Sequence, residues 1–280
     1  MNKLKVLVLT DFSPLSVVAL QYAGKMSQKL EVEFSIVNVV RLDGLPRTNM
    51  KLKSIEKDLI EAAKDEGAAL AGELKKVAKP ECVINFEAIK GHTVTEVVER
   101  YVKKNAIDLV VMGSQGASSL KKFRLGGTAV SVIETCPVPV LTIPKWATFK
   151  NFETVVYASD LKNVQKELDT IIPFARNFNS TIMMVHVVQM IDKAADALKN
   201  EVEKLIAKSN YPKISFKLII EENIPEAIDG YIKSSKADLL TTFTHELNLY
   251  EKLFGLSVTR TLAYQGNIPL LAFKRKTTKK

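Results

Sequence analysis

Four glycines in one short basic segment are the residues of this sequence best suited to chemistry with an anion. Gly113, Gly116, Gly126 and Gly127 lie within VVMGSQGASSLKKFRLGGTAV, residues 110–130, which begins as an apolar run. Because glycine has no Cβ, backbone N–H groups beside it can approach a phosphate closely, and a helix that begins after the last glycines adds its N-terminal N–H groups. The segment is therefore a candidate phosphate-binding loop. Glycines also serve simply to turn the chain, and that alternative stays open.

The elements that must position this loop alternate between strand and helix. The predicted strands are 4–10, 32–40, 82–89, 108–113 and 138–144, and the predicted helices are 15–29, 52–78, 93–105 and one that begins near residue 126. Strands joined by helices of this length run parallel, so the first half is predicted to be a doubly wound parallel sheet with helices on both faces. Ser13 and Pro14 suit the N-cap and the first turn of the first helix.

The second half of the chain repeats the first. ETVVYASDL at 153–161 parallels LKVLVLTDF at 4–12, and Asp160 takes the position of Asp11. The other matching segments are MMVHVV (183–188), ISFKLII (214–220), KADLLTTF (236–243) and GNIPLLAF (266–273). We therefore expect two tandem α/β domains, residues 1–146 and 151–275, followed by a basic tail, 276–280. The connection between them is short, so the two domains are expected to pack closely.

Composition and charge narrow the class of protein. The chain of 280 residues is 46% hydrophobic and 25% charged, which is typical of a soluble globular protein. No apolar run reaches the ~18 residues of a membrane helix, and Asp11 interrupts the N-terminus before a secretory apolar region is complete. The net charge is +9, but five positive charges lie in KRKTTKK at 274–280, so dedicated nucleic-acid binding is not expected. Cys82 and Cys136 are isolated, which favours a reducing compartment and a cytoplasmic protein.

Three segments carry a family resemblance. TDFSPLSVVALQYA follows the first strand, DLVVMGSQGASSLKKFRLGG includes and follows the fourth, and CPVPVLTIP contains the fifth. Together they resemble a universal stress protein domain, and the repeat makes the whole chain similar to the tandem members of that family. The resemblance implies two domains of the adenine nucleotide α-hydrolase-like fold that pack as an intrachain pseudo-dimer, with a homodimer of chains as a further option.

The resemblance also implies a nucleotide site in the first domain only. Members that bind ATP, with or without Mg²⁺, have a loop with the pattern glycine, two residues, glycine, nine residues, glycine, then Ser or Thr. Gly113, Gly116 and Gly126 match, whereas Gly127 stands where the hydroxyl residue is expected and Thr128 comes one residue later. The implied site residues are Asp11 near adenine or ribose, Val39 along the base, Met112 beside the nucleotide, and Gly113, Gly116, Gly126, Gly127 and Thr128 around the phosphates.

The second domain departs from the same pattern. At the matching positions it has Phe243, Glu246 and Leu256 in place of the three glycines. Two of these side chains would occupy space that the backbone needs for close approach, and the carboxylate would repel phosphate. We therefore expect no ATP binding by the second domain, and we expect Asp160 to cap a helix.

These features lead to one expected function and two alternatives. We expect a cytoplasmic universal stress protein that binds or senses ATP through its first domain, acts through an unidentified protein partner and is not an enzyme. His92, His186 and His245 are scattered without metal-ligand spacing, and no catalytic residue or metal site is predicted. One alternative is a stress-response interaction protein that binds no nucleotide. The other is a slow ATPase or phosphotransfer protein.

Overall fold

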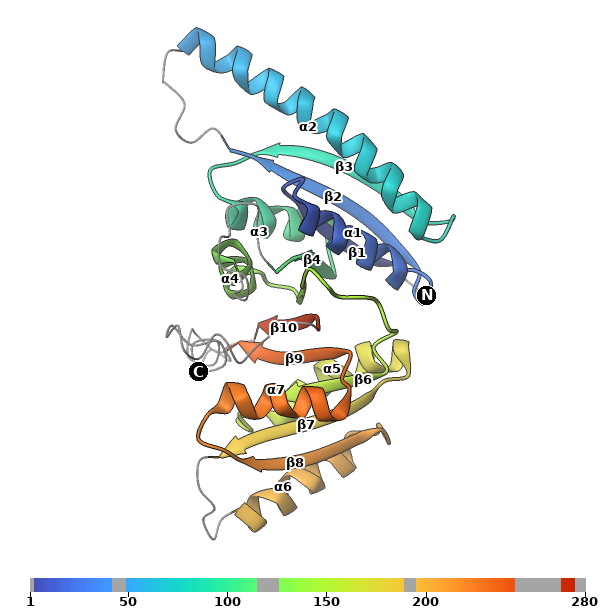
Figure 1. Cartoon of the computed structure of the whole chain (residues 1–280), viewed down its shortest axis with the longest axis vertical. Helices are drawn as coiled ribbons and strands as arrows, with labels where there is room; N and C mark the ends of the chain where they lie inside the picture. Colours follow the sequence, from blue (N-terminus) through green and yellow to red (C-terminus); the bar gives the residue numbers. More distant parts are fainter. Residues whose placement is uncertain (1–2, 42–48, 115–125, 189–194, 245–267, 275–280) are drawn as a thin grey trace. The chain divides into compact units, whose positions relative to one another are not determined.

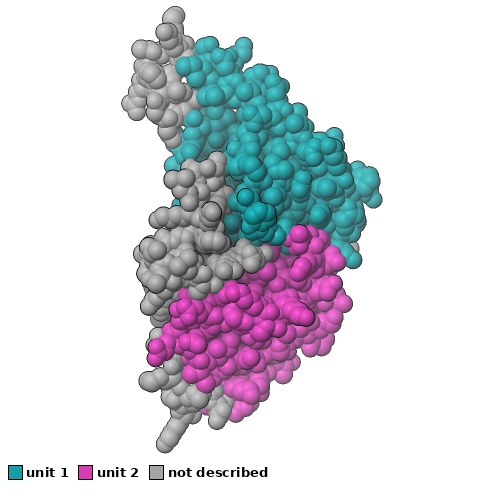
Figure 2. All heavy atoms as spheres, viewed as in Figure 1, with its two compact units in different colours: residues 1–147 teal, residues 148–280 magenta. Residues whose placement is uncertain are grey.

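The computed structural model describes residues 3–41, 49–114, 126–188, 195–244 and 268–274. The chain forms two compact units, residues 1–147 and 148–280 (Figure 2). Each unit is described by itself below. None of the helices in the described ranges is both long enough and apolar enough to cross a membrane.

Unit 1, residues 1–147, is a doubly wound α/β domain (Figure 1). Its strands are β1 (Leu4–Thr10), β2 (Val32–Val40), β3 (Val83–Lys90), β4 (Leu109–Gly113) and β5 (Val140–Ile143). Its helices are α1 (Pro14–Met26), α2 (Asn49–Val77), α3 (Val94–Asn105) and α4 (Gly127–Thr135). The strands lie in the order β3-β2-β1-β4-β5, and every pair is parallel.

The strand order of unit 1 reverses at one point. The chain moves from β1 outward to β2 and β3, then returns to the other side of β1 with β4 and β5. Right-handed crossovers then place α1 and α2 on one face of the sheet and α3 and α4 on the other. Accordingly, α1 contacts α2 and α3 contacts α4. β1 and β4 are covered on both faces, which explains their continuous apolar sequences.

Helix starts in unit 1 follow local capping chemistry. Ser13 is the N-cap of α1, its hydroxyl accepts a hydrogen bond from Ser16 N at 3.3 Å, and Pro14 is the first helical residue. The prediction for these two residues is confirmed. Thr93 caps α3 in the same way, through a hydrogen bond from Glu96 N at 3.3 Å.

Unit 2, residues 148–280, repeats this topology. In its described residues the strands are β6 (Thr154–Ala158), β7 (Thr181–Val188), β8 (Ile214–Ile220), β9 (Leu239–Thr244) and β10 (Leu270–Lys274), and the helices are α5 (Val164–Phe178), α6 (Ala195–Lys208) and α7 (Ile224–Ser235). They form a parallel sheet in the order β8-β7-β6-β9-β10. The predicted fold class, two doubly wound domains with five-stranded parallel sheets, is confirmed.

Candidate functional site

The candidate site lies at the carboxyl edge of the unit 1 sheet, where the strand order reverses. Open α/β sheets bind ligands in the crevice beyond the carboxyl ends of their strands at such a point. The structure places Asp11 directly after β1, Val39 near the end of β2, and Met112 and Gly113 as the last two residues of β4. Because β1 pairs with both β2 and β4, these strand ends are neighbours.

The turn after β1 is fixed by side chains that bond to the backbone. Asp11 Oδ1 accepts a hydrogen bond from Ser13 N at 3.1 Å, and Thr10 Oγ1 accepts one from Phe12 N at 3.0 Å. Phe12 takes a left-handed backbone conformation, with φ of 61°. Such a conformation is uncommon outside glycine, and the two flanking hydrogen bonds hold it. Asp11 is therefore part of a defined turn at the edge of the candidate site.

Asn38 is a residue of this edge that the sequence reasoning missed. Its side-chain amide donates a 2.9 Å hydrogen bond to the carbonyl oxygen of Thr10, the last residue of β1. Asn38 is buried, so this bond satisfies a carbonyl that water would reach poorly. The signal in the sequence was a polar residue inside the apolar run FSIVNVV.

The two ends of the glycine-bearing loop are joined at its base. Ser114 N donates to the carbonyl of Ile143 at 2.9 Å, which extends the pairing of β4 with β5 beyond Gly113. Gly126 N then donates to the carbonyl of Ser114 at 2.7 Å. Ser114 and Gly126 therefore lie side by side at the sheet edge. Gly116 lies outside the described residues.

Helix α4 begins directly after this closure. Gly126 is its N-cap and provides no side-chain cap, and Val130 N bonds to the Gly126 carbonyl at 3.0 Å. Gly127 and Thr128 form the exposed first turn, which has no acidic residue, whereas Ala129 is buried. The first N–H groups of a helix lack partners within the helix and carry the positive end of its dipole. The start of α4 therefore favours an anion.

Gly127 has no packing reason to be glycine. A Cβ built on Gly127 would have nothing within 4 Å among the described residues. Gly126, with φ of −67° and ψ of 151°, also has a backbone conformation that other residues adopt readily. At Gly127 no described neighbour requires glycine, and at Gly126 the backbone conformation does not require it.

The corresponding edge of unit 2 is filled by aromatic side chains. Phe243 stands at the position of Gly113 and is 4% exposed. Its ring stacks on Phe273 with centroids 4.9 Å apart and meets Tyr157 edge-on at 6.0 Å. The Tyr157 hydroxyl forms hydrogen bonds with Glu167 and Ser159. Glu246 and Leu256 lie outside the described residues.

The expectation that Asp160 caps a helix is wrong. The N-cap of α5 is Asn163, and Asp160 Oδ1 instead accepts a hydrogen bond from Lys162 N at 3.1 Å. Counted from the matching aspartates, the helix of unit 2 begins one residue later than that of unit 1, because Asp11 is three residues before Pro14 and Asp160 is four before Val164. Asp160 therefore repeats the turn geometry of Asp11.

The described ranges contain no group of three or more His, Cys, Asp or Glu side chains placed to hold a metal ion. Cys82 and Cys136 both lie in these ranges, and neither forms a disulfide.

The fold and the site define a doubly wound α/β domain with a glycine-flanked helix start at its switch point. Residues 4–144 match the model of the universal stress protein family, and the chain belongs to that family. The universal stress protein MJ0531 of Methanocaldococcus jannaschii is 32% identical over 142 residues, which cover 50% of this chain and 82% of that protein. The universal stress protein YxiE of Bacillus subtilis is 29% identical over 146 residues, which cover 49% of this chain and 97% of that protein.

The fold likeness to a solved structure extends over both units. The crystal structure of a universal stress protein from Archaeoglobus fulgidus DSM 4304 matches with a TM-score of 0.71 and 21% sequence identity. The match covers 97% of this chain and 98% of the other. The fold of both units is therefore that of a known universal stress protein.

Proposed function

We propose that this protein binds ATP at the carboxyl edge of unit 1 and responds to stress by presenting its nucleotide-dependent surface to a protein partner. The observation that carries the proposal is the hydrogen bond from Gly126 N to the Ser114 carbonyl. It seats the base of the glycine-bearing loop against the start of α4, whose first turn has no side-chain cap. The first N–H groups of α4 and its dipole would then face a phosphate bound beside this closure, as phosphate binding requires.

Each proposed site residue has a role that follows from its place. Backbone N–H groups of Gly127 and Thr128, and those near Gly113 and Gly116, would bind phosphate oxygens. The N–H of Gly126 bonds to the Ser114 carbonyl, so Gly126 would contribute close approach without a Cβ. Thr128 would supply the hydroxyl that position 127 lacks. Val39 and Met112 would contact the base, and Asp11 would lie near adenine or ribose. The helix dipole contributes about 0.3–1 kcal/mol to such an anion site. Mg²⁺, where present, would arrive with the phosphates.

Binding is proposed for unit 1 alone. In unit 2 the side chain of Phe243 packs between Tyr157 and Phe273 at the position that Gly113 leaves without a side chain. A phosphate cannot approach the backbone there without displacing a buried ring. This packing supports a second unit that keeps the fold without the nucleotide.

A binding function in the cytoplasm is proposed rather than turnover. Two cysteines outside any disulfide suit a reducing compartment. Family membership supports a stress-response role, and the effect of ATP would be to change which partner protein the chain binds. The partner is unidentified.

Isothermal titration of the full chain with ATP, in EDTA and in Mg²⁺, tests the proposal. We expect saturable binding of one ATP per chain, and we expect Gly116→Val to abolish it. Gly72→Val is the control, because a Cβ at Gly72 meets nothing within 4 Å. Absence of saturable binding would favour the interaction protein that binds no nucleotide. Two sites per chain would contradict binding by unit 1 alone, and release of phosphate over many turnovers would favour the slow ATPase.

A further inference from the structure

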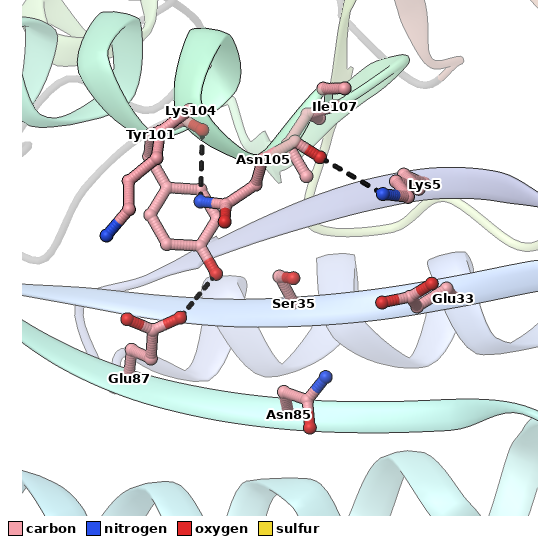
Figure 3. Close-up of a pocket in the computed structure, with 10 residues that line it drawn as sticks. Lys5, Glu33, Ser35, Asn85, Glu87, Tyr101, Lys104, Asn105 and Ile107 are labelled. Atoms are coloured by element: carbon pink, nitrogen blue, oxygen red, sulfur yellow. Dashed lines mark hydrogen bonds between the residues drawn. The ribbon is translucent and has the colours of Figure 1, made fainter.

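Unit 1 also has a pocket toward the amino ends of its first two strands. It has a volume of about 360 Å³ and lies on the face of the sheet that α3 covers (Figure 3). Lys5 comes from β1, Glu33 from β2, Asn85 and Glu87 from β3, and Tyr101 and Lys104 from α3. Ligand pockets span roughly 300–1,000 Å³, so this one suits a small ligand.

The polar groups of this pocket are held in place. The Tyr101 hydroxyl donates a 2.6 Å hydrogen bond to Glu87 Oε1, and the ammonium group of Lys5 donates to the Asn105 carbonyl at 3.3 Å (Figure 3). Burial of Tyr101, and next its hydrogen bond to Glu87, raise the pKa of the phenol to about 12. At neutral pH Tyr101 is therefore a fixed donor, and it holds the Glu87 carboxylate at the wall of the pocket.

The charges around the pocket do not neutralise one another directly. Two carboxylates, Glu33 and Glu87, and two ammonium groups, Lys5 and Lys104, line it. Among the ion pairs of the described residues, none joins these four side chains. A small molecule with one positive and one negative group could therefore form charge-assisted hydrogen bonds with a carboxylate and an ammonium group of the pocket at the same time.

Unit 2 shows that the fold does not need these charges. The hydrogen bond from Lys5 N to Asp108 has a counterpart in unit 2, from Thr154 N to Asp238. These bonds show which residues of the two units are equivalent. At the equivalent positions, Thr154 replaces Lys5, Thr181 replaces Glu33, Lys217 replaces Glu87 and Ser234 replaces Lys104.

The tyrosine is kept in both units, but its contact changes. Tyr231 takes the place of Tyr101, and Lys217 Nζ lies over its ring at 5.0 Å. The same strands and helix therefore pack without two carboxylates facing two lysines. The charged set of unit 1 calls for an explanation other than folding.

We propose that this pocket of unit 1 binds a small zwitterion of the α-amino acid class. Glu33 would receive the ammonium group, and Lys5, its register neighbour on β1, would receive the carboxylate. Glu87 and Lys104 lie at the other side of the pocket and would contact the ligand's side chain (Figure 3). This proposal does not depend on ATP binding, because Lys5 and Glu33 lie at the amino ends of β1 and β2, whereas Asp11 and Val39 lie at their carboxyl ends.

Saturation-transfer NMR on the full chain, with a mixture of the twenty proteinogenic amino acids, tests the proposal. The strongest binder is then titrated beside its two analogues that lack either the amino or the carboxyl group. We expect each analogue to bind about tenfold more weakly, since each loses a charge-assisted hydrogen bond. No saturable binding up to about 10 mM would overturn the proposal, as would equal binding of the analogue that has only the amine.

Charge-neutral variants locate the binding. Glu33→Gln and Lys5→Gln are expected to weaken it about tenfold each, with the thermal unfolding curve unchanged. The controls are Glu31→Gln and Lys103→Gln, two exposed neighbours that do not line the pocket. Equal losses in the controls would overturn the proposal. ATP titration of Glu33→Gln should match the wild type, so the two sites can fail separately.

Discussion

The two units build the same turn after their first strand and then diverge at the end of their fourth. Phe12 and Leu161 both have φ of 61°, and Asp11 and Asp160 both accept a 3.1 Å hydrogen bond from the backbone two residues on. The strand ends opposite these turns, however, carry Gly113 in unit 1 and buried Phe243 in unit 2. Both units therefore share the turn after the first strand, whereas only unit 1 has a glycine at the end of its fourth strand.

A second repeated contact supports this reading. Asn38 in unit 1 and His186 in unit 2 occupy equivalent positions. Asn38 forms a hydrogen bond with the carbonyl oxygen of Thr10, and His186 forms one with the carbonyl oxygen of the equivalent residue, Ser159. Different side chains thus meet one backbone requirement. The two units form equivalent side-chain hydrogen bonds at the carboxyl edge of the sheet. They differ in the volume of the side chains that fill this edge.

The largest effect is expected from removing the aromatic ring that fills the carboxyl edge of the unit 2 sheet. Phe243→Ala removes a ring packed against Tyr157 and Phe273, and we expect it to lower the free energy of unfolding of unit 2 by about 3–5 kcal/mol. Urea unfolding of the full chain measures this. Trp146→Ala is the control, because Trp146 is 75% exposed and should change the value by less than about 0.5 kcal/mol. A loss below about 1 kcal/mol would contradict the packing role.

The next largest effect is expected from placing the phenylalanine of unit 2 at the matching position of unit 1. Gly113→Phe is expected to weaken ATP binding about 100-fold, because the ring would take the space of phosphate-binding backbone groups. Titration calorimetry measures the change, with the exposed Gly230→Phe as control.

A milder variant guards against misfolding at the same edge. Gly126→Val places a Cβ at a residue whose φ of −67° and ψ of 151° valine tolerates. It should also weaken ATP binding while leaving unfolding near the wild type. Unchanged affinity in both variants would remove the glycines from the proposed site.

A smaller difference in unfolding free energy is expected between variants of two hydrogen-bonded pairs, Tyr157–Glu167 and Tyr101–Glu87. Tyr157→Phe takes a hydroxyl from Glu167, which is 2% exposed, and should cost about 1–3 kcal/mol of unfolding free energy. Tyr101→Phe takes one from exposed Glu87, where water replaces the bond, and should cost less than about 1 kcal/mol. Chemical unfolding of both variants tests the order, and the reverse order would contradict it.

The smallest effect restores the hydroxyl that the family pattern expects. Gly127→Ser adds a side chain where nothing lies within 4 Å, and should tighten ATP binding by about three- to tenfold through one more hydrogen bond to phosphate. Gly127→Ala is the matched control and should leave the affinity within about twofold, since it adds the Cβ without the hydroxyl. Equal tightening by both variants would assign the gain to helix formation instead.

Much of the fold could be predicted because buried parallel strands have a distinctive sequence. β1 and β4 are apolar on both faces, so their positions follow from composition alone. The start of α1 follows from Ser13 and Pro14, since capping is a local interaction. Asp160 shows the limit: one extra residue in a turn moved the cap to Asn163, and periodicity does not register such a change.

The candidate ATP site and the second pocket differ in what the sequence could reveal. Asp11, Met112 and Gly113 stand at strand ends, so topology alone places them at one edge. Asn38 could have been noticed as a polar residue in an apolar run. The charged pocket left no comparable signal, because Lys5, Glu33 and Glu87 come from three strands.

The sequence by itself determined the alternation of strands and helices, the repeat and the glycine-bearing segment, because these depend on local composition and spacing. Only the tertiary structure decided which distant residues meet. Strand register set Lys5 beside Glu33 and Ser35 beside Asn85, and the crossover of α3 brought Tyr101 to Glu87. Packing likewise buried Phe243 between two other rings. Such contacts join residues far apart in the chain, so they are fixed by the way the sheet assembles rather than by any local preference.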